Sequence, residues 1–155
     1  MFAIAAIDVD CAAMPLAPLL SGPARRFRPH VTLMPRFDAD ASPAVQAALA
    51  NAALPQALVV SGPRSPTSDL LWYECDPNCE GYADMVALHN LCASFAKSEC
   101  GAYSGSGFRP HMTIASETGS LPEGLPGTLR LTPIAMVIYR FGHDPNFDPV
   151  SRYPI

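Results

Sequence analysis

The sequence predicts an α+β fold with a mainly antiparallel sheet, and three observations support this class. Apolar runs of strand length outnumber the segments with helical periodicity. The two kinds of segment do not alternate regularly along the chain, as they would in a parallel α/β fold. The chain has 155 residues and is 49% hydrophobic, which suits one domain, and we expect residues 1–155 to form a single domain of two lobes.

Apolar runs and turn residues divide the first half of the chain. There are 17 prolines, and because proline interrupts regular structure they separate short elements. Ser42 followed by Pro43 is typical of a helix start, since serine caps a helix and proline fits its first turn. These signals predict strands at Phe2–Val9, Phe27–Phe37, Leu58–Ser61 and Leu70–Cys75, a short helix around Leu16–Leu20, a helix from Ser42 to Pro55 and a loop at Gly62–Ser68.

The second half is predicted to hold the longest helix and the remaining strands. Between Glu80 and Ser98, apolar residues recur at steps of three and four, which is the period of an amphipathic helix. The pattern further predicts a turn region at Gly101–Gly107, strands at Phe108–Ala115, Thr128–Leu131 and Ile134–Phe141, a loop at Glu117–Gly127 and a tail interrupted by prolines.

Charge, apolar runs and cysteines limit the function classes. The net charge is −4, so we expect no extended binding to DNA or RNA, although a nucleotide or an RNA end stays compatible. The longest apolar run, Met1–Ile7, is shorter than the roughly 20 residues that cross a bilayer, so no membrane contact is expected. The five cysteines lack metal-ligand spacing and predict reduced thiols without a structural zinc site. We expect a monomer in the cytoplasm that needs no metal or other cofactor.

A short internal repeat carries the chemistry of this chain. Residues 27–33 read Phe-Arg-Pro-His-Val-Thr-Leu and residues 108–114 read Phe-Arg-Pro-His-Met-Thr-Ile, so five of seven positions are identical. Background frequencies produce such a match in a chain of this length about one time in a hundred or less. The repeat contains two of the four histidines, one in each copy.

Strand geometry gives the repeat a physical meaning. Side chains alternate between the two faces of a strand, so His30 and Thr32 share one face, and His111 and Thr113 do the same. The apolar residues between them point toward a core. The proline before each histidine cannot donate to a β-ladder, which places that point at a strand start or at a sheet edge. Two such strands related by a pseudo-twofold axis would surround one central cavity.

Two imidazoles and two hydroxyls around one cavity suit phosphoryl transfer. A neutral histidine takes a proton from the attacking water or hydroxyl, and a protonated histidine gives a proton to the leaving oxygen. Because the reference pKa of histidine is about 6.5, both forms are populated near neutral pH. Threonine hydroxyls can donate to the non-bridging phosphoryl oxygens. We therefore predict that the catalytic residues are His30, His111, Thr32 and Thr113, with no metal among them.

The paired His-x-Thr motif resembles the 2H phosphoesterase superfamily, which includes 2′-5′ RNA ligase-like proteins and 2′,3′-cyclic nucleotide phosphodiesterases. The likeness covers most of the chain. Further segments that stand in the family's order are the opening strand with Asp8, residues Leu71–Pro77 before the long helix, Tyr139-Arg140 on a late strand and the ending Tyr153-Pro154-Ile155.

This resemblance implies both a fold and an activity. The fold is bilobal, with two mainly antiparallel sheets related by pseudo-twofold symmetry around a central cleft and with helices on the outer faces. The activity is metal-independent hydrolysis of cyclic phosphates or 2′-5′ phosphodiesters, in which His30, Thr32, His111 and Thr113 take the positions of the family motif.

Two departures from the family pattern favour a small substrate over RNA. Ser116 stands where RNA ligase-like bacterial members often carry an arginine, and the first motif continues with Met34-Pro35-Arg36-Phe37 instead of a stretch that ends in glycine. We expect a cyclic phosphodiesterase that converts a 2′,3′-cyclic nucleotide or a sugar cyclic phosphate to a phosphomonoester, by family analogy the 2′-phosphate. The alternatives are a 2′-5′ RNA ligase or phosphodiesterase acting on RNA ends, and a non-catalytic module that binds a nucleotide or an RNA end.

Several residues outside the motif are candidates for substrate contact. Strand parity puts Arg28 and Arg109 on the histidine side, where they could meet a phosphate, and the alternative is a solvated position. Aromatic faces can stack on a nucleobase, although core packing is the competing role. The aromatic candidates are Phe37, Trp72, Tyr73 and Tyr139. The histidines His89 and His143 are expected to be a packing or surface residue and a loop residue, respectively.

Overall fold

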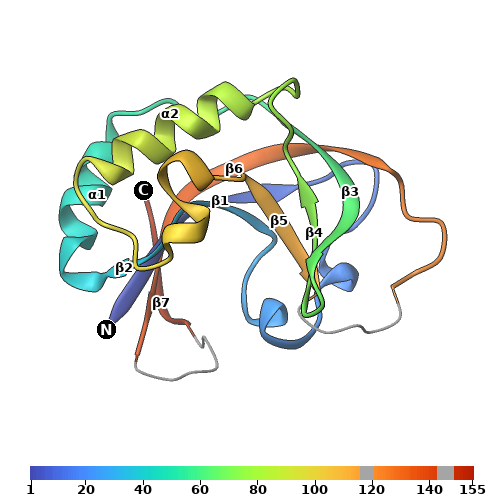
Figure 1. The fold of residues 1–155 in the computed structure, drawn as a ribbon, viewed down its shortest axis with the longest axis horizontal. Helices are drawn as coiled ribbons and strands as arrows, with labels where there is room; N and C mark the ends of the chain where they lie inside the picture. Colours follow the sequence, from blue (N-terminus) through green and yellow to red (C-terminus); the bar gives the residue numbers. More distant parts are fainter. Residues whose placement is uncertain (116–120, 143–148) are drawn as a thin grey trace.

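The structure is a computed structural model that describes residues 1–115, 121–142 and 149–155, and it has the predicted α+β class (Figure 1). Its α-helices are α1 (Ser42–Ala50) and α2 (Tyr82–Ala93). Its strands are β1 (Phe2–Asp10), β2 (His30–Asp38), β3 (Leu58–Thr67), β4 (Leu70–Glu74), β5 (His111–Ala115), β6 (Thr128–Phe141) and β7 (Pro149–Pro154). No helix within the described ranges is long and apolar enough to span a membrane. Ser116, His143 and the start of the predicted loop Glu117–Gly127 lie outside those ranges.

Strand β6 joins the two halves of the sheet. The strands follow the order β2-β1-β6-β3-β4-β5, and β7 pairs with β6 off this path. Each of these pairings is antiparallel. Residues 128–131 of β6 pair with β3, whereas residues 132–141 pair with β1. Figure 1 shows β6 arching over both halves. The two predicted sheets therefore share one long strand.

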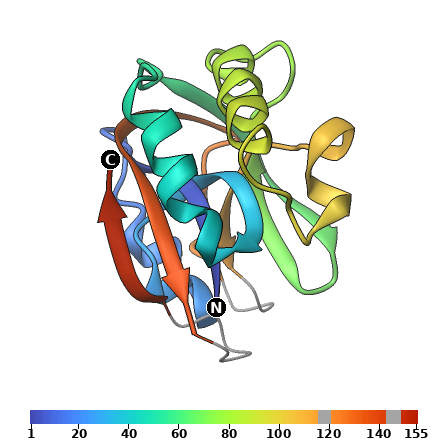
Figure 2. The same cartoon turned by 90° about the vertical axis from the view of Figure 1, so that its left-hand side faces the viewer.

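The two α-helices contact each other and pack on one main core (Figure 2). Gly81 precedes α2 with a φ of 88°, and a Cβ atom there would lie 2.5 Å from the carbonyl oxygen of Ala57. Glycine is therefore required at this close approach, which sets where α2 begins. Buried residues of the main core come from both helices and from β1 to β6, and include Ile7, Leu33, Val45, Leu49, Val60, Met85, Leu88, Ile114 and Leu131.

Two proline-containing strands are longer than predicted. The segment Gly62–Ser68, predicted as a loop, instead continues β3 as far as Thr67 and pairs with β4 through an irregular register. The Gly62 N–H still donates to the Gly127 carbonyl at 3.0 Å. Beyond Gly62, the described residues pair β3 with β4 on one side only, so Pro63 and Pro66 occupy an edge position. The predicted strands Thr128–Leu131 and Ile134–Phe141 are one strand, because Pro133 lies at a register shift in the ladder with β1.

Other differences concern element ends. α2 ends at Ala93 and not at Ser98, because the chain turns back to the edge of β2, where the Glu99 N–H donates to the Arg36 carbonyl at 2.7 Å. The predicted tail contains β7. The remaining changes are short: α1 ends at Ala50, the histidines begin β2 and β5, and 3₁₀ turns occupy Ala17–Leu19 and Gly22–Arg26.

Candidate active site

The two histidines occupy equivalent positions at the starts of β2 and β5, which are the end strands of the path. Pro29 and Pro110 precede them and donate no ladder hydrogen bond. The proline carbonyls accept instead, from Val9 N–H on β1 at 2.9 Å and from Cys75 N–H after β4 at 2.8 Å. The prediction that each proline marks a strand start is confirmed. The repeated sequence therefore makes a repeated structure.

The backbone holds both imidazoles in the same orientation. His30 Nδ1 lies 2.8 Å from the Arg28 carbonyl oxygen, and His111 Nδ1 lies 2.7 Å from the Arg109 carbonyl oxygen. A carbonyl oxygen only accepts, so Nδ1 carries the hydrogen in both rings. This leaves Nε2 of each ring available for proton transfer to or from a bound molecule.

A cavity of about 300 Å³ connects the two motifs. His30 and Thr32 line it from β2, and Thr113 lines it from β5. Most of its remaining wall is apolar, and the lining residues are Ile4, Leu20, Ala24, Phe27, Arg28, Pro35, Arg36, Leu70, Cys100 and Phe141. Most of the lining residues come from the N-terminal 36 residues, so the cavity lies mainly on the side of His30.

A buried carboxylate lies opposite His30. Asp8 is fully buried and pairs with His30 across the β1–β2 ladder. The Tyr139 hydroxyl donates to Asp8 Oδ1 at 2.7 Å, and Arg152 Nε donates to Asp8 Oδ2 at 2.9 Å. The Tyr139 ring also lies beside the imidazole, with the ring centroids 5.6 Å apart. Strand β7, which carries Arg152, thereby supports the first histidine.

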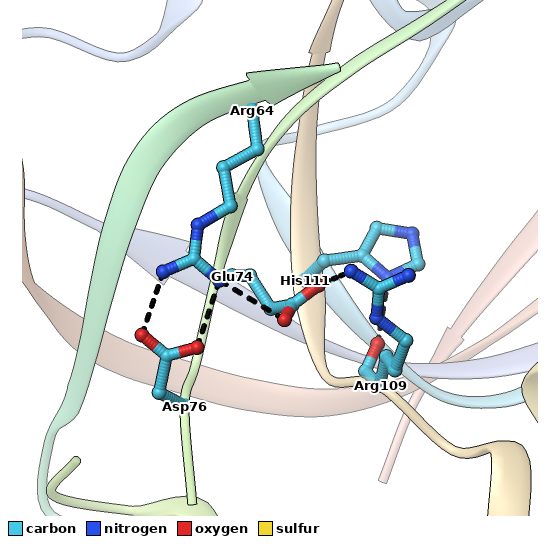
Figure 3. A network of polar contacts seen from close by, with 5 residues as sticks. All are labelled: Arg64, Glu74, Asp76, Arg109 and His111. Carbon is cyan, nitrogen blue, oxygen red and sulfur yellow. Dashed lines mark hydrogen bonds and ion pairs between the residues drawn. The ribbon is translucent and has the colours of Figure 1, made fainter. Parts of the chain in front are cut away.

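The second histidine has a matching carboxylate with different partners. Glu74 pairs with His111 across the β4–β5 ladder and is 8% exposed. Figure 3 shows Glu74 between two arginines: Arg64 Nη1 lies 3.1 Å from Oε2, and Arg109 Nη2 lies 2.6 Å from Oε1. Arg64 also binds Asp76 at 2.7 Å and 2.8 Å. These contacts place a cation next to the second histidine.

Charge and burial act differently on the two rings. Burial lowers the pKa of His30, whereas the bond to the Arg28 carbonyl and the negative charge of Asp8 raise it, with a net decrease. Burial lowers the pKa of His111 to about 4; the Arg109 carbonyl opposes this, and the positive charges of His30 and Arg109 add to it. The positive charge of His30 thus acts on His111, so the two rings lie near enough to interact electrostatically.

The predicted binding residues fall into three environments. Arg28 lines the cavity, whereas Arg109 is held by Glu74 and lies 5.2 Å from the centre of the Trp72 ring. Trp72 is fully buried and stacks on His111 with the ring centroids 3.7 Å apart. The three other aromatic candidates are also buried, Tyr139 beside His30 and both Phe37 and Tyr73 in the main core. Their substrate contacts stay predictions.

Sequence reasoning did not assign a role to either carboxylate. Asp8 and Glu74 are acidic residues inside apolar strand segments, Ile7-Asp8-Val9 and Tyr73-Glu74-Cys75, and such a position requires a partner because an unpaired buried charge is costly. That signal could have identified them. Tyr103, whose ring centroid lies 6.2 Å from that of His111, carried no signal. Among the described residues, no group of three or more His, Cys, Asp or Glu is arranged to hold a metal ion.

Comparisons with known proteins agree with this geometry. A family model described as the 2′-5′ RNA ligase superfamily matches residues 9–136. A crystal structure described as a phosphoesterase is similar, with a TM-score of 0.55 and 18% identity over 99% of this chain and 97% of that one. E. coli LigT complexed with NADP+ has a TM-score of 0.53 and 18% identity over 99% and 96% of the two chains. No curated protein matches the chain. At this identity, the solved structures establish the shared fold.

Proposed function

Because the chain belongs to the 2′-5′ RNA ligase superfamily of 2H phosphoesterases, we propose that it hydrolyses a 2′,3′-cyclic nucleotide or a related sugar cyclic phosphate to a phosphomonoester. The observation that carries the proposal is the identical fixing of two imidazoles by the backbone, with Nε2 of each available. Simple packing does not require the same tautomer in both copies of the repeat. His30 lines the cavity, and His111, which is not a lining residue, lies two positions before Thr113, which is. Thr32 and Thr113 complete the proposed site, since their hydroxyls can donate to the non-bridging oxygens of a phosphate.

The proposed reaction is one in-line displacement at phosphorus. A water molecule attacks as His111 Nε2 removes its proton, and the bond between phosphorus and the 3′ oxygen breaks. His30 gives its Nε2 proton to that leaving oxygen. The product is the 2′-phosphomonoester, and proton exchange with solvent restores both rings. The proton transfers are supplied by the two histidines, so the proposed reaction is independent of metal.

Charge supports this division of roles. Asp8 favours the protonated form of His30, which suits a general acid. Arg109 and burial favour the neutral form of His111, which suits a general base. The cavity supports the same assignment, because it lies on the side of His30 and the leaving oxygen stays attached to the organic part of a cyclic phosphate.

A nucleotide is the best-supported substrate class. The apolar cavity wall, which includes Phe27 and Phe141, offers flat surfaces to a base. A protein of this fold, E. coli LigT, has been crystallised with 3′-AMP and with NADP+. The family name favours a second candidate, a 2′-5′ linked RNA end, which would use the same histidines.

A substrate panel tests the proposal. Purified protein is incubated in EDTA with the four 2′,3′-cyclic nucleotides and with a 2′-5′ linked dinucleotide, and products are separated by chromatography. The double variant His30→Ala/His111→Ala serves as the blank. We expect 2′-nucleotides from the wild type only. Turnover that disappears on chelation would contradict the metal-free reaction, and cleavage of the dinucleotide alone would favour the RNA-end alternative. Saturable binding without turnover of any substrate would indicate a binding module.

A further inference from the structure

A third histidine, His89, connects the two motifs from helix α2. Its side chain is buried, with 1% exposure. Nδ1 lies 2.7 Å from the Leu33 carbonyl oxygen, and the Gly105 N–H donates to Nε2 at 2.9 Å. The ring stacks on Phe108, with the centroids 4.1 Å apart and an angle of 6° between the planes. Leu33 ends the first heptapeptide and Phe108 begins the second, so one ring contacts both copies of the repeat.

These partners define the chemical form of His89. The Leu33 carbonyl accepts a hydrogen bond, so Nδ1 carries the hydrogen, and the Gly105 amide donates, so Nε2 presents a lone pair. The neutral imidazole therefore satisfies both groups at once. A phenyl ring can replace the stack on Phe108 but neither hydrogen bond.

The strand order shows why a direct connection matters. His30 and His111 lie on β2 and β5, which end the hydrogen-bonded path and are separated along it by five strand pairings. The two strands also contact each other directly, but no ladder in the described part of the chain joins them. Registers shift within the β1–β2, β1–β6, β3–β4 and β4–β5 ladders, so the paired strands do not connect the two ends in one regular register. Proton transfer to and from one phosphorus tolerates little displacement, since a misplacement of about 1 Å can cost roughly 10²-fold in rate.

We propose that His89 is a positioning residue that sets the separation of the two active-site histidines, an inference that rests on the proposed function. It acts through Leu33 on the strand of His30, and through Gly105 and Phe108 on the segment that leads into His111. The segment after α2 adds two bonds to β2, because the Glu99 N–H and Ser98 Oγ both donate to the Arg36 carbonyl, at 2.7 Å and 3.1 Å.

The test separates positioning from stability. His89→Phe keeps the buried ring and the stack on Phe108, and removes both hydrogen bonds. His89→Gln keeps an amide that can replace part of them. Met85→Ala is the matched control, since Met85 is a fully buried residue one turn earlier on α2 and its truncation destabilises the same helix. All variants are assayed at a temperature where circular dichroism shows them folded.

We expect His89→Phe to lower kcat about tenfold or more and to leave KM within about twofold, because the ground-state contacts to substrate are unchanged. His89→Gln should recover part of the loss. Met85→Ala should keep the wild-type kcat despite a comparable loss of thermal stability. An unchanged kcat in folded His89→Phe, or an equal fall of kcat in Met85→Ala, would overturn the inference.

A second readout does not depend on turnover. Hydrogen exchange should find the Gly105 amide protected in the wild type and exchanging quickly in His89→Phe. In a titration with inorganic phosphate, the imidazole NMR signals of His30 and His111 should shift with one shared apparent affinity in the wild type. In His89→Phe the two signals should report different affinities. If the wild type hydrolyses nothing, the proposed function fails, and these measurements still decide the connection: equal phosphate responses in both proteins would refute it.

Discussion

His30 and His111 are fixed by the same backbone bond, yet the charges around them differ. Asp8 is fully buried opposite His30 and is held by Tyr139 and Arg152. Opposite His111, the more accessible Glu74 lies between two arginines. The nearest influential charge is therefore negative for the first histidine and positive for the second.

The difference teaches how a duplicated motif can support two opposite tasks. The repeat alone makes the two rings equivalent, and equivalent rings would have equal pKa values. The surroundings distinguish them: the carboxylate of Asp8 on β1 favours the protonated form of His30, and Arg109, two residues before His111, favours the neutral form of His111. The asymmetry comes from Asp8, which lies outside the repeat, and from two arginines at equivalent positions of the repeat: Arg109 pairs with Glu74, whereas Arg28 lines the cavity.

The sharpest way to break the comparison is to remove each histidine in turn. His30→Gln and His111→Gln should each lower kcat for a cyclic nucleotide by about 10²–10⁴-fold. A phosphodiester with a p-nitrophenolate leaving group needs no acid, so with this substrate His30→Gln should regain most of its rate and His111→Gln should not. The reverse pattern, followed by absorbance of the released phenolate, would exchange the two roles.

How much the sequence reveals depends on how local the signal is. The strand starts at His30 and His111 and the pairing of each with a threonine follow from a seven-residue repeat. The partners of Asp8 do not, because Tyr139 and Arg152 meet it from 131 and 144 positions away. Strand β7 was missed for the same reason, since only its pairing with β6 makes it a strand.

Because Asp8 and Glu74 differ in burial and partners, removing one arginine from each should cause unequal losses of stability. Arg152→Met leaves a fully buried carboxylate without its cation and should lower the free energy of unfolding by about 3–5 kcal/mol. Arg64→Met leaves Glu74 with Arg109, and the Arg64–Asp76 pair is 38% and 34% exposed, so its loss should cost only about 0–1 kcal/mol. Urea denaturation measures both, and equal losses would contradict the proposed difference in burial.

The pH dependence should show the same asymmetry. NMR titration is expected to place the pKa of His111 at about 4 and that of His30 below the model-peptide value of 6.5. With His111 as base and His30 as acid, the profile of kcat/KM should rise as His111 loses its proton and fall as His30 loses its own. Both limbs should lie on the acid side of neutrality, because both pKa values are lowered. Asp8→Asn should move the alkaline limb to lower pH, because Asp8 raises the pKa of His30, whereas Glu74→Gln should leave that limb in place.

These pKa values also determine how stability changes with pH. Both histidines have a lower pKa in the folded chain than in the unfolded chain, so the unfolded chain binds more protons below pH 6.5, for His111 down to about pH 4. The free energy of unfolding should therefore fall as the pH is lowered through this range. Urea denaturation at pH 7 and pH 4.5 measures the change, and a stability that rises on acidification would show that the rings are charged in the fold.

The smallest expected effect compares two buried tyrosine hydroxyls. Tyr139 donates to the carboxylate of Asp8 at 2.7 Å, and Tyr73 donates to the neutral carbonyl of Pro126, also at 2.7 Å. Hydrogen bonds to charged groups contribute about 1.5–3 kcal/mol and neutral ones about 0.5–1.5 kcal/mol. Tyr139→Phe should therefore destabilise the protein by about 1 kcal/mol more than Tyr73→Phe, as urea denaturation can measure. If the two losses are equal, Arg152 alone compensates the buried charge of Asp8, and Tyr139 contributes only by packing beside His30.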